Sequence, residues 1–461
     1  MTAQTLFSTL ALQPALLDTV TQLGWQQMTP VQAQSLPPIL EGRDVIAQAK
    51  TGSGKTAAFA LGVLQQLDTT LRQPQALVLC PTRELAAQVA EEMRQLARAI
   101  PNCKIMTLTG GTPVQRQADS LAHGVHIVVG TPGRVLDHLE RQSLDVSAVL
   151  MLVLDEADRM IDMGFYDEMS HIEALCPRQR QTLLFSATYP DHVDKDATRF
   201  VRDAIHVQVQ TELTSVPVQH YFYAVAAEER FDAVVRLLLH HQPTSALLFC
   251  NTKLVSDQLC DYLRSLGFSA LALHGDLDQR QRDEVLIQFA NHSCSILVAT
   301  DVAARGLDIQ GLPVVINVEL PHQVESYIHR IGRTGRADQT GVALSFFEAK
   351  DKPLLQLLQQ AGIDTGVGVL PPASRQARPH SAPMKTVVII GGKRDKLRPG
   401  DILGALTGDA GLDKDHVGKI QVGMVVSHVA IATEVAALAL DRLLRHGIKG
   451  KRFKAHFVRN S

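Results

Sequence analysis

The sequence predicts an α/β protein in which two tandem, doubly wound parallel-sheet domains precede a small α+β domain. Short apolar runs alternate with helical stretches along the first part of the chain, and the same alternation restarts after residues 205–220. Strands that alternate with helices are typical of parallel sheets covered by helices on both faces. A proline-rich stretch then separates both series from a basic tail in which the elements follow a different order.

The first expected strand, residues 44–47, leads into the glycine-rich sequence AKTGSGKT. Its glycines let backbone N–H groups close around phosphate oxygens, its lysine supplies a positive charge to the terminal phosphates, and its threonine offers a hydroxyl to a magnesium ion. A plain glycine-rich turn is the alternative, and the first position is alanine where the general motif has glycine. The strand before the loop and the helical pattern after it favour a phosphate-binding loop. The residues expected to contact the nucleotide are Ala49, Lys50, Thr51, Gly52, Ser53, Gly54, Lys55 and Thr56.

Four further apolar runs in this domain end in small or polar residues. They are residues 76–80 before PTREL, 126–130 before TPGR, 149–154 before DEAD and 182–185 before SAT. In open α/β sheets, ligands bind outside the carboxyl ends of the strands, so Asp155 and Glu156 should face a ligand rather than bulk water. Alone, this acidic pair could equally be a solvated turn, but the phosphate-binding loop upstream favours a site.

The second series predicts another α/β domain of similar size, without a phosphate-binding loop. Its expected strands lie within residues 246–252, 270–275, 295–301, 314–321 and 341–347. A tandem of two such domains predicts a cleft between them. The arginines of HRIGRTGR, residues 329–336, could reach across it to a phosphate held by the first domain. Such a cluster is often only a basic surface turn, but its glycines and the companion nucleotide site favour arginine fingers.

Composition is that of an ordinary soluble globular protein, with 45% apolar and 20% charged residues in 461. We find no apolar stretch long enough for a membrane span and no signal-peptide pattern, so no membrane contact is expected. The six cysteines are scattered, without a CxxC pair, which indicates buried thiols in a reducing cytoplasm.

The tail is basic and has its own order of elements. Residues 366–384 contain four prolines and predict a semi-rigid linker, and residues 385–461 carry 14 lysines and arginines against 7 acids, although the whole chain has a net charge of −2. Its patterns run strand, helix, strand, strand, helix, strand, which is the topology of an RNA recognition motif. Residues 387–390 and 427–432 occupy the strand positions where stacking aromatics are expected, and none is Phe, Tyr or Trp. Base stacking on this sheet is therefore in doubt.

In chain order, these motifs resemble those of the DEAD-box RNA helicases. The resemblance covers residues 5–350 and rests on GWQQMTPVQ, AKTGSGKT, PTRELAAQ, Gly110-Gly111, TPGR, DEAD, SAT, QRQR, ATDVAARGLDI and HRIGRTGR. It implies two RecA-like domains, at residues 1–208 and 209–365, ahead of the linker at 366–384 and the RRM-like domain at 385–461. It also implies RNA-stimulated hydrolysis of ATP with Mg²⁺, coupled to local strand separation.

The resemblance gives each motif residue a role. Gln32, which alone would be taken for a helix-start residue, would read adenine, with Phe7 and Trp25 as apolar contacts and Asp308 on the ribose. Asp155 would hold magnesium through water together with Thr56, and Glu156 would deprotonate the attacking water. Arg333 and Arg336 would stabilise the transferred phosphoryl group. Residues implied to couple the domains are Ser186, Thr188 and His329. RNA would lie on the opposite strand-end surface, against Thr82, Arg83, Gly111, Thr131, Arg134, Gln279, Arg282 and Thr300.

A DEAD-box core followed by a proline-rich linker and an aromatic-poor basic domain resembles the bacterial DEAD-box proteins of the A type. That resemblance implies a cytoplasmic monomer that binds a hairpin of large-subunit (23S) ribosomal RNA in pre-ribosomal particles. The tail residues expected to grip RNA are Lys393, Arg394, Lys451 and Arg452, although both basic runs could be mere solvated loops. Two other functions stay open. One is an RNA-stimulated ATPase clamp on another structured RNA, and the other is an ATPase acting on DNA or protein.

Overall fold

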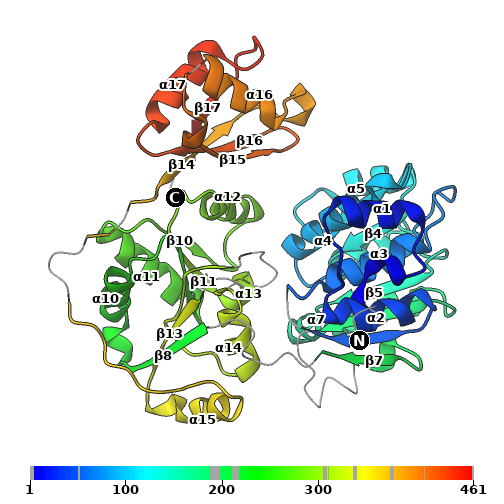
Figure 1. The fold of residues 1–461 in the computed structure, drawn as a ribbon, viewed down its shortest axis with the longest axis horizontal. Helices are drawn as coiled ribbons and strands as arrows, with labels where there is room; N and C mark the ends of the chain where they lie inside the picture. The colour runs from blue at the N-terminus through cyan, green and yellow to red at the C-terminus, as the bar shows by residue number, and fades with distance from the viewer. Residues whose placement is uncertain are drawn as a thin grey trace. The chain divides into compact units, whose positions relative to one another are not determined.

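The computed structural model describes residues 5–49, 52–186, 198–209, 218–304, 309, 311–335, 340–373, 378–379, 381–409 and 411–458. These residues form two parallel-sheet domains and a small antiparallel-sheet domain (Figure 1), so the predicted fold class is confirmed. Within the described ranges, no helix is both long and apolar enough to cross a membrane.

The first domain contains a seven-stranded sheet in the order β3-β4-β2-β5-β6-β1-β7, with every neighbouring pair parallel. The four strands from β2 to β1 in that order are almost wholly buried, which explains the apolar runs that they contain. The strands are β1 (Val45–Gln48), β2 (Ala76–Leu79), β3 (Ile105–Leu108), β4 (Ile127–Gly130), β5 (Met151–Asp155), β6 (Gln181–Ser186) and β7 (Ile205–Gln208).

Successive side chains of these strands point to opposite faces of the sheet and form two hydrophobic cores, one on each face. Val78 and Val153 belong to one cluster, whereas Leu77 and Leu152 belong to the other. The first cluster is completed by α1 to α4 and the second by α5 to α8. The helices are α1 (Pro14–Gln22), α2 (Pro30–Leu40), α3 (Lys55–Gln65), α4 (Arg83–Leu96), α5 (Val114–Ala122), α6 (Pro132–Glu140), α7 (Ala157–Asp162) and α8 (Tyr166–Leu175).

The second domain repeats this plan with six parallel strands in the order β10-β11-β9-β12-β13-β8. Leu344 and Ala343 of β13 point into different clusters, completed by α10 and α11 on one face and by α14 and α15 on the other. The strands are β8 (Val218–Ala224), β9 (Ala246–Cys250), β10 (Ala270–Leu273), β11 (Ile296–Thr300), β12 (Val314–Asn317) and β13 (Gly341–Phe347). The helices are α10 (Arg230–His241), α11 (Lys253–Ser265), α12 (Gln279–Ala290), α13 (Asp301–Ala304), α14 (Val324–Ile331) and α15 (Lys352–Gln360).

The third domain has the predicted strand-helix-strand-strand-helix-strand order. Its antiparallel sheet runs β15-β16-β14-β17, and both helices pack on one face over Val387 and Ile389. The elements are β14 (Met384–Ile389), α16 (Pro399–Gly404), β15 (Val417–Val422), β16 (Ser427–Ala432), α17 (Ala436–His446) and β17 (Ala455–Phe457). On the other face, Thr386 and Val388 pair with Ala430 and His428, so no Phe, Tyr or Trp ring lies at these positions.

Part of the predicted linker is attached to the second domain. Val367 forms a parallel bridge with Phe222 at the edge strand β8, and Arg236 Nε donates to the Pro371 carbonyl at 2.8 Å. At the start of the third domain, the buried Thr386 hydroxyl accepts from Asn291 Nδ2 at 3.1 Å. These contacts fix both ends of the proline-rich stretch to residues of the second domain.

The sequence analysis did not identify the strands β3, β7 and β8. All three are edge strands of their sheets, and all three carry partly or fully exposed residues. A strand covered on only part of its surface has no continuous apolar run, so its pairing partners rather than its own residues define it.

Candidate nucleotide and RNA sites

The nucleotide motifs of the first domain meet at the carboxyl edge of the sheet. The phosphate-binding loop follows β1, Asp155 ends β5, and β6 lies between these strands. Ala49 N–H donates to the carbonyl of Ser186 at the end of β6, at 3.0 Å. Three sequence motifs far apart in the chain therefore occupy one stretch of this edge, as parallel pairing requires.

Lys55 is the first residue of α3, and its side chain is inside the site. The residue is only 6% exposed, and its ammonium Nζ is buried without a hydrogen-bond partner in the described part of the chain. The Ser53 hydroxyl is buried in the same condition. Because a buried cation without an acceptor is costly, these donors at a helix N-terminus fit the terminal phosphates of a nucleotide.

Asp155 is 3% exposed at the end of β5. Burial raises the pKa of its carboxyl from 3.8 to about 7, although the nearby Lys55 ammonium lowers it and the Glu156 carboxylate raises it. A buried carboxyl that is costly to ionise by itself becomes favourable to ionise beside a divalent cation. Asp155 and the Thr56 hydroxyl at the start of α3 thus have the oxygen chemistry that Mg²⁺ prefers.

Glu156 has an uncommon backbone conformation for its type, with φ 54° and ψ 50°. Its carboxylate Oε2 accepts from Arg159 Nη1 at 2.7 Å, and both side chains are buried. Arg159 played no part in the sequence interpretation, since a charge within the first turn of a helix is normally solvated. The structure places it as the fixed partner of the expected catalytic base.

Gln32 joins the adenine motif to the phosphate-binding loop. Its backbone N–H and side-chain oxygen form a capping box with Thr29 at the start of α2, and its Nε2 donates to the Gly54 carbonyl at 3.1 Å. A Cβ on Gly54 would lie 2.5 Å from that nitrogen, and Gly54 has φ 92°, so only glycine fits there.

The two aromatic residues expected near adenine differ in accessibility. Phe7 is buried, and its ring stacks with the partly exposed Trp25 at 6.4 Å between centroids. Phe7 therefore supports Trp25 rather than presenting a free face of its own.

The expected RNA contacts of the first domain gather at the carboxyl ends of β2, β3 and β4. Thr82 caps α4, Thr131 is the N-cap residue of α6, and Arg134 Nη1 donates to the Thr112 carbonyl at 2.8 Å. A Cβ on Gly110 would overlap the guanidinium of Arg83, so the glycine pair admits this arginine. Gly111 has φ 84°.

The expectation that RNA would lie on the opposite strand-end surface is wrong for these residues. Because all seven strands are parallel, every motif that follows a strand lies at the same edge. The separation is lateral. The expected RNA contacts follow strands of the β3-β4-β2 half of the sheet, and the phosphate-binding loop, Asp155, Glu156 and Ser186 lie at the ends of strands of the β5-β6-β1 half.

The second domain has the same lateral division. Gln279 and Arg282 begin α12 after β10, and Thr300 ends the neighbouring strand β11. His329 lies on α14, which follows β12, and the buried Arg333 lies two residues beyond the end of that helix. Five predicted site residues, Lys50, Thr51, Thr188, Asp308 and Arg336, lie outside the described residues.

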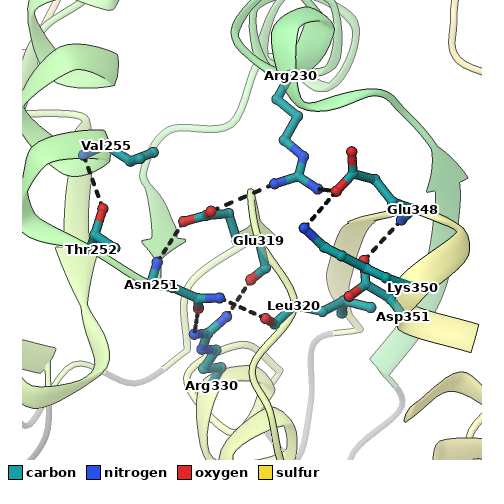
Figure 2. Close-up of polar contacts among 10 residues, drawn as sticks. All are labelled: Arg230, Asn251, Thr252, Val255, Glu319, Leu320, Arg330, Glu348, Lys350 and Asp351. Atoms are coloured by element: carbon teal, nitrogen blue, oxygen red, sulfur yellow. Dashed lines mark hydrogen bonds and ion pairs between the residues drawn. The ribbon is translucent and has the colours of Figure 1, made fainter. Parts of the chain in front are cut away.

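Figure 2 shows a polar network in the second domain that sequence reasoning missed. Arg330 and Arg230 are both buried and both contact Glu319, the former through the backbone carbonyl and the latter through the carboxylate. Asn251 N–H donates to the same carboxylate at 2.8 Å. Arg330 belongs to the predicted arginine cluster. The sequence HRIGRTGR does not show which of its arginines is buried inside the domain and which faces a ligand.

The two basic runs of the tail lie side by side. Ile390 N–H donates to the Lys454 carbonyl at 2.8 Å, and Lys393 and Arg394 N–H groups donate to carbonyls of the 423–424 loop. Lys449, which is close in sequence to Lys451, forms an ion pair with Asp401 at 2.9 Å. We define the basic loop surface as eight exposed residues of the two basic runs and the loop at residues 423–425: Lys393, Arg394, Lys396, Met424, Val425, Lys451, Arg452 and Lys454.

A nucleotide site on one half of a RecA-like sheet and candidate RNA contacts on the other half are the features of a nucleotide-driven RNA remodelling enzyme. Family models agree. The DEAD/DEAH box helicase model matches residues 29–196, the helicase conserved C-terminal domain model matches residues 229–338, and the DbpA RNA binding domain model matches residues 386–456. The chain belongs to the DEAD-box ATP-dependent RNA helicases.

Along nearly its whole length the chain is similar to ATP-dependent RNA helicase DbpA of Escherichia coli strain K12, with 49% identity over 459 residues, 99% of this chain and 100% of that protein. DEAD-box ATP-dependent RNA helicase CshA of Bacillus cereus is 42% identical over 357 residues, 77% of this chain and 68% of that protein.

Two solved structures extend the likeness to the fold. Dbp5 of S. cerevisiae bound to RNA and ADP BeF3 has 31% identity and a TM-score of 0.72, covering 79% of this chain and 95% of that one. Mss116p bound to ssRNA and AMP-PNP has 29% identity and a TM-score of 0.69, covering 77% of each chain.

Proposed function

We propose that the C-terminal domain targets this helicase to a hairpin of 23S ribosomal RNA, where ATP hydrolysis drives local strand separation during assembly of the large ribosomal subunit. The observation that carries the proposal is the basic loop surface, on a domain that matches the DbpA RNA binding model. Its partners would be pre-ribosomal particles in the cytoplasm, which the protein would enter as a monomer.

The nucleotide site would work through the first domain's own residues. Lys55 would grip the terminal phosphates, and Asp155, ionised on binding, would act with Thr56 on Mg²⁺, which supplies charge neutralisation for the transferred phosphoryl group. Arg159 holds Oε2 of Glu156. The other carboxylate oxygen would then accept a proton from the attacking water.

Residues of the second domain would complete catalysis and coupling. Arg333 and Arg336 would stabilise the charge that develops on the transferred phosphoryl group, and Asp308 would accept from the ribose. Coupling between the domains would use Ser186, Thr188 and His329.

The core would meet RNA through phosphates and sugars, using Thr82, Arg83, Gly111, Thr131, Arg134, Gln279, Arg282 and Thr300. Such contacts fix position and carry no sequence information. Specificity would therefore belong to the third domain. Its sheet face has no Phe, Tyr or Trp at the β14 and β16 positions, and Thr386 on that face is already hydrogen-bonded to Asn291. The basic loop surface would grip the folded hairpin, and His428 and His456 could read unpaired bases.

The test is salt-dependent binding of the full-length protein to a 23S ribosomal RNA hairpin, with a shuffled hairpin of equal length as the competitor. Reversing the charges of Lys451 and Arg452 to Glu should weaken binding and lower the slope of log affinity against log salt by about 1–2, the value for two lost phosphate contacts. The control reverses Lys414 and Arg445, exposed residues elsewhere in the domain, and should leave hairpin preference unchanged.

If the Lys451/Arg452 variant keeps both the slope and the preference, the basic loop surface is not the RNA site. A strand-release assay with and without ATP then separates unwinding from clamping. Hairpin-dependent ATP hydrolysis without release of the complementary strand would contradict the strand-separation part of the proposal.

A further inference from the structure

Arg330 heads the set of largest fully buried side chains in the described part of the chain, being 1% exposed. Its guanidinium has five N–H groups, and each has an acceptor. Nε and Nη2 donate to the two carboxylate oxygens of Asp301, both at 2.6 Å. The remaining N–H groups donate to Asn251 Oδ1 at 2.8 Å, Asn317 Oδ1 at 3.3 Å and the Glu319 carbonyl at 2.6 Å, and Figure 2 shows those to Asn251 and Glu319.

This arrangement requires arginine. The planar fork forms the bidentate pair with Asp301, and the guanidinium also lies 5.0 Å from the centre of the Phe249 ring. A lysine has at most three donors, so a substitution that keeps the charge leaves at least two of these five hydrogen bonds unmade. With every donor committed inside the domain, Arg330 has none left for a phosphate. Its role therefore differs from that proposed for Arg333.

The contacts of Arg330 join three neighbouring strand ends to one helix. Asn251 follows β9, Asp301 follows β11, and Asn317 ends β12, while Arg330 itself lies on α14. Two of these elements lead to proposed functional residues. Thr300, a proposed RNA contact, immediately precedes Asp301, and Arg333 follows the end of α14 by two residues.

A second contact involves the short helix α13, which begins with Asp301. Arg282, also a proposed RNA contact, donates from Nη2 to the Ala303 carbonyl of α13 at 3.3 Å. The four-residue α13 is thus held by Arg282 at one end and, through Asp301, by Arg330 at the other. A shift of the β11–α13 corner on RNA binding would move the carboxylate that fixes α14.

We propose that Arg330 is a positioning residue that transmits RNA binding at the end of β11 to the Arg333 segment through its bidentate pair with Asp301. The inference rests on the proposed functions of Thr300, Arg282 and Arg333. It predicts that the Arg330–Asp301 pair sets the degree to which RNA stimulates ATP hydrolysis, rather than the affinity for RNA.

The measured quantity is the ratio of RNA-saturated to RNA-free ATP turnover in the full-length protein, with nucleotide-free RNA affinity measured in parallel. Arg330→Lys and the near-isosteric Asp301→Asn should each lower the ratio, by on the order of 10² for the lysine variant, as expected for a misplaced catalytic group. RNA affinity should stay within about twofold. A loss of correctly folded protein alone would reduce both turnovers equally and leave their ratio unchanged.

Arg230→Met is the matched control. Arg230 is also a buried arginine of this domain, but its partners are Glu319 and Glu348, and neither lies on α13 or α14. This variant should lower thermal stability without changing the stimulation ratio. The Arg330→Lys/Asp301→Asn double variant should lower the ratio no further than the stronger single variant, because both remove the same contact.

The proposal is overturned if Arg330→Lys and Asp301→Asn keep the wild-type ratio, or if their effects multiply in the double variant. Arg333→Ala tests the underlying assignment separately. Wild-type stimulated turnover in Arg333→Ala would refute the role of Arg333, whereas loss in Arg333→Ala with an unchanged ratio in Arg330→Lys would refute only the transmission through Arg330.

Discussion

Replacing Asp155 with Asn should stabilise the nucleotide-free first domain, and the gain should grow with pH. The native pKa of about 7 lies above the ordinary value of 3.8, so the folded domain holds this proton over a pH range in which the unfolded chain has lost it. Stability must therefore fall as pH rises through that range.

The magnitude follows from the pKa difference. At 1.36 kcal/mol per pKa unit, the buried carboxyl costs about 4 kcal/mol at pH 8 but only about 2 kcal/mol at pH 5, where the native carboxyl stays protonated. Asparagine does not ionise, so Asp155→Asn removes this cost. The resulting gain in the free energy of unfolding should be larger at pH 8 than at pH 5 by roughly 2–3 kcal/mol. That difference corresponds to roughly 4–12 °C of extra Tm gain for a domain of this size.

The assay is thermal unfolding followed by tryptophan fluorescence at both pH values. Trp25 is the only tryptophan of the chain and lies in the first domain, so the signal reports on that domain alone. Asp137→Asn is the control, because hydrogen bonding to Arg141 lowers the pKa of Asp137. The contribution of Asp137 to stability is fully present above its ordinary pKa of 3.8, so the effect of Asp137→Asn on Tm should not change between pH 5 and pH 8. An equal Tm gain for Asp155→Asn at both pH values would refute the burial argument.

Three further outcomes are expected. Lys55→Ala and Glu156→Gln should both abolish ATP hydrolysis, but equilibrium titration should show weaker nucleotide binding only for Lys55→Ala; a Glu156→Gln form that binds no nucleotide would exclude Glu156 as the base. Arg333→Ala should reduce kcat by roughly 10³-fold with a much smaller change in KM for ATP, as arginine-finger losses do. Gly110→Ala should displace the overlapping Arg83 guanidinium and weaken RNA binding, while RNA-free ATPase turnover stays unchanged; equal RNA affinity would contradict the proposed contact.

The chain's local chemistry determined much of the fold. The central strands β2, β4 and β5 are buried on both faces, so each had to be a nearly continuous apolar run, and the phosphate-binding loop needs its glycines and lysine in one short segment. The topology of the third domain was also predictable, because its strands and helices have distinct periodicities.

Only the tertiary structure decided which groups are buried and which lie together. Arg330 and Arg333 look alike in the sequence, yet all five N–H groups of Arg330 are satisfied by strand ends that no local pattern brings near it. Lys449 is close in sequence to the predicted RNA contacts Lys451 and Arg452, yet it forms an ion pair with Asp401, which is distant in sequence. The strands β3, β7 and β8 and the lateral division of the sheet could not be predicted for the same physical reason, because burial and pairing are set by neighbours in space rather than along the chain.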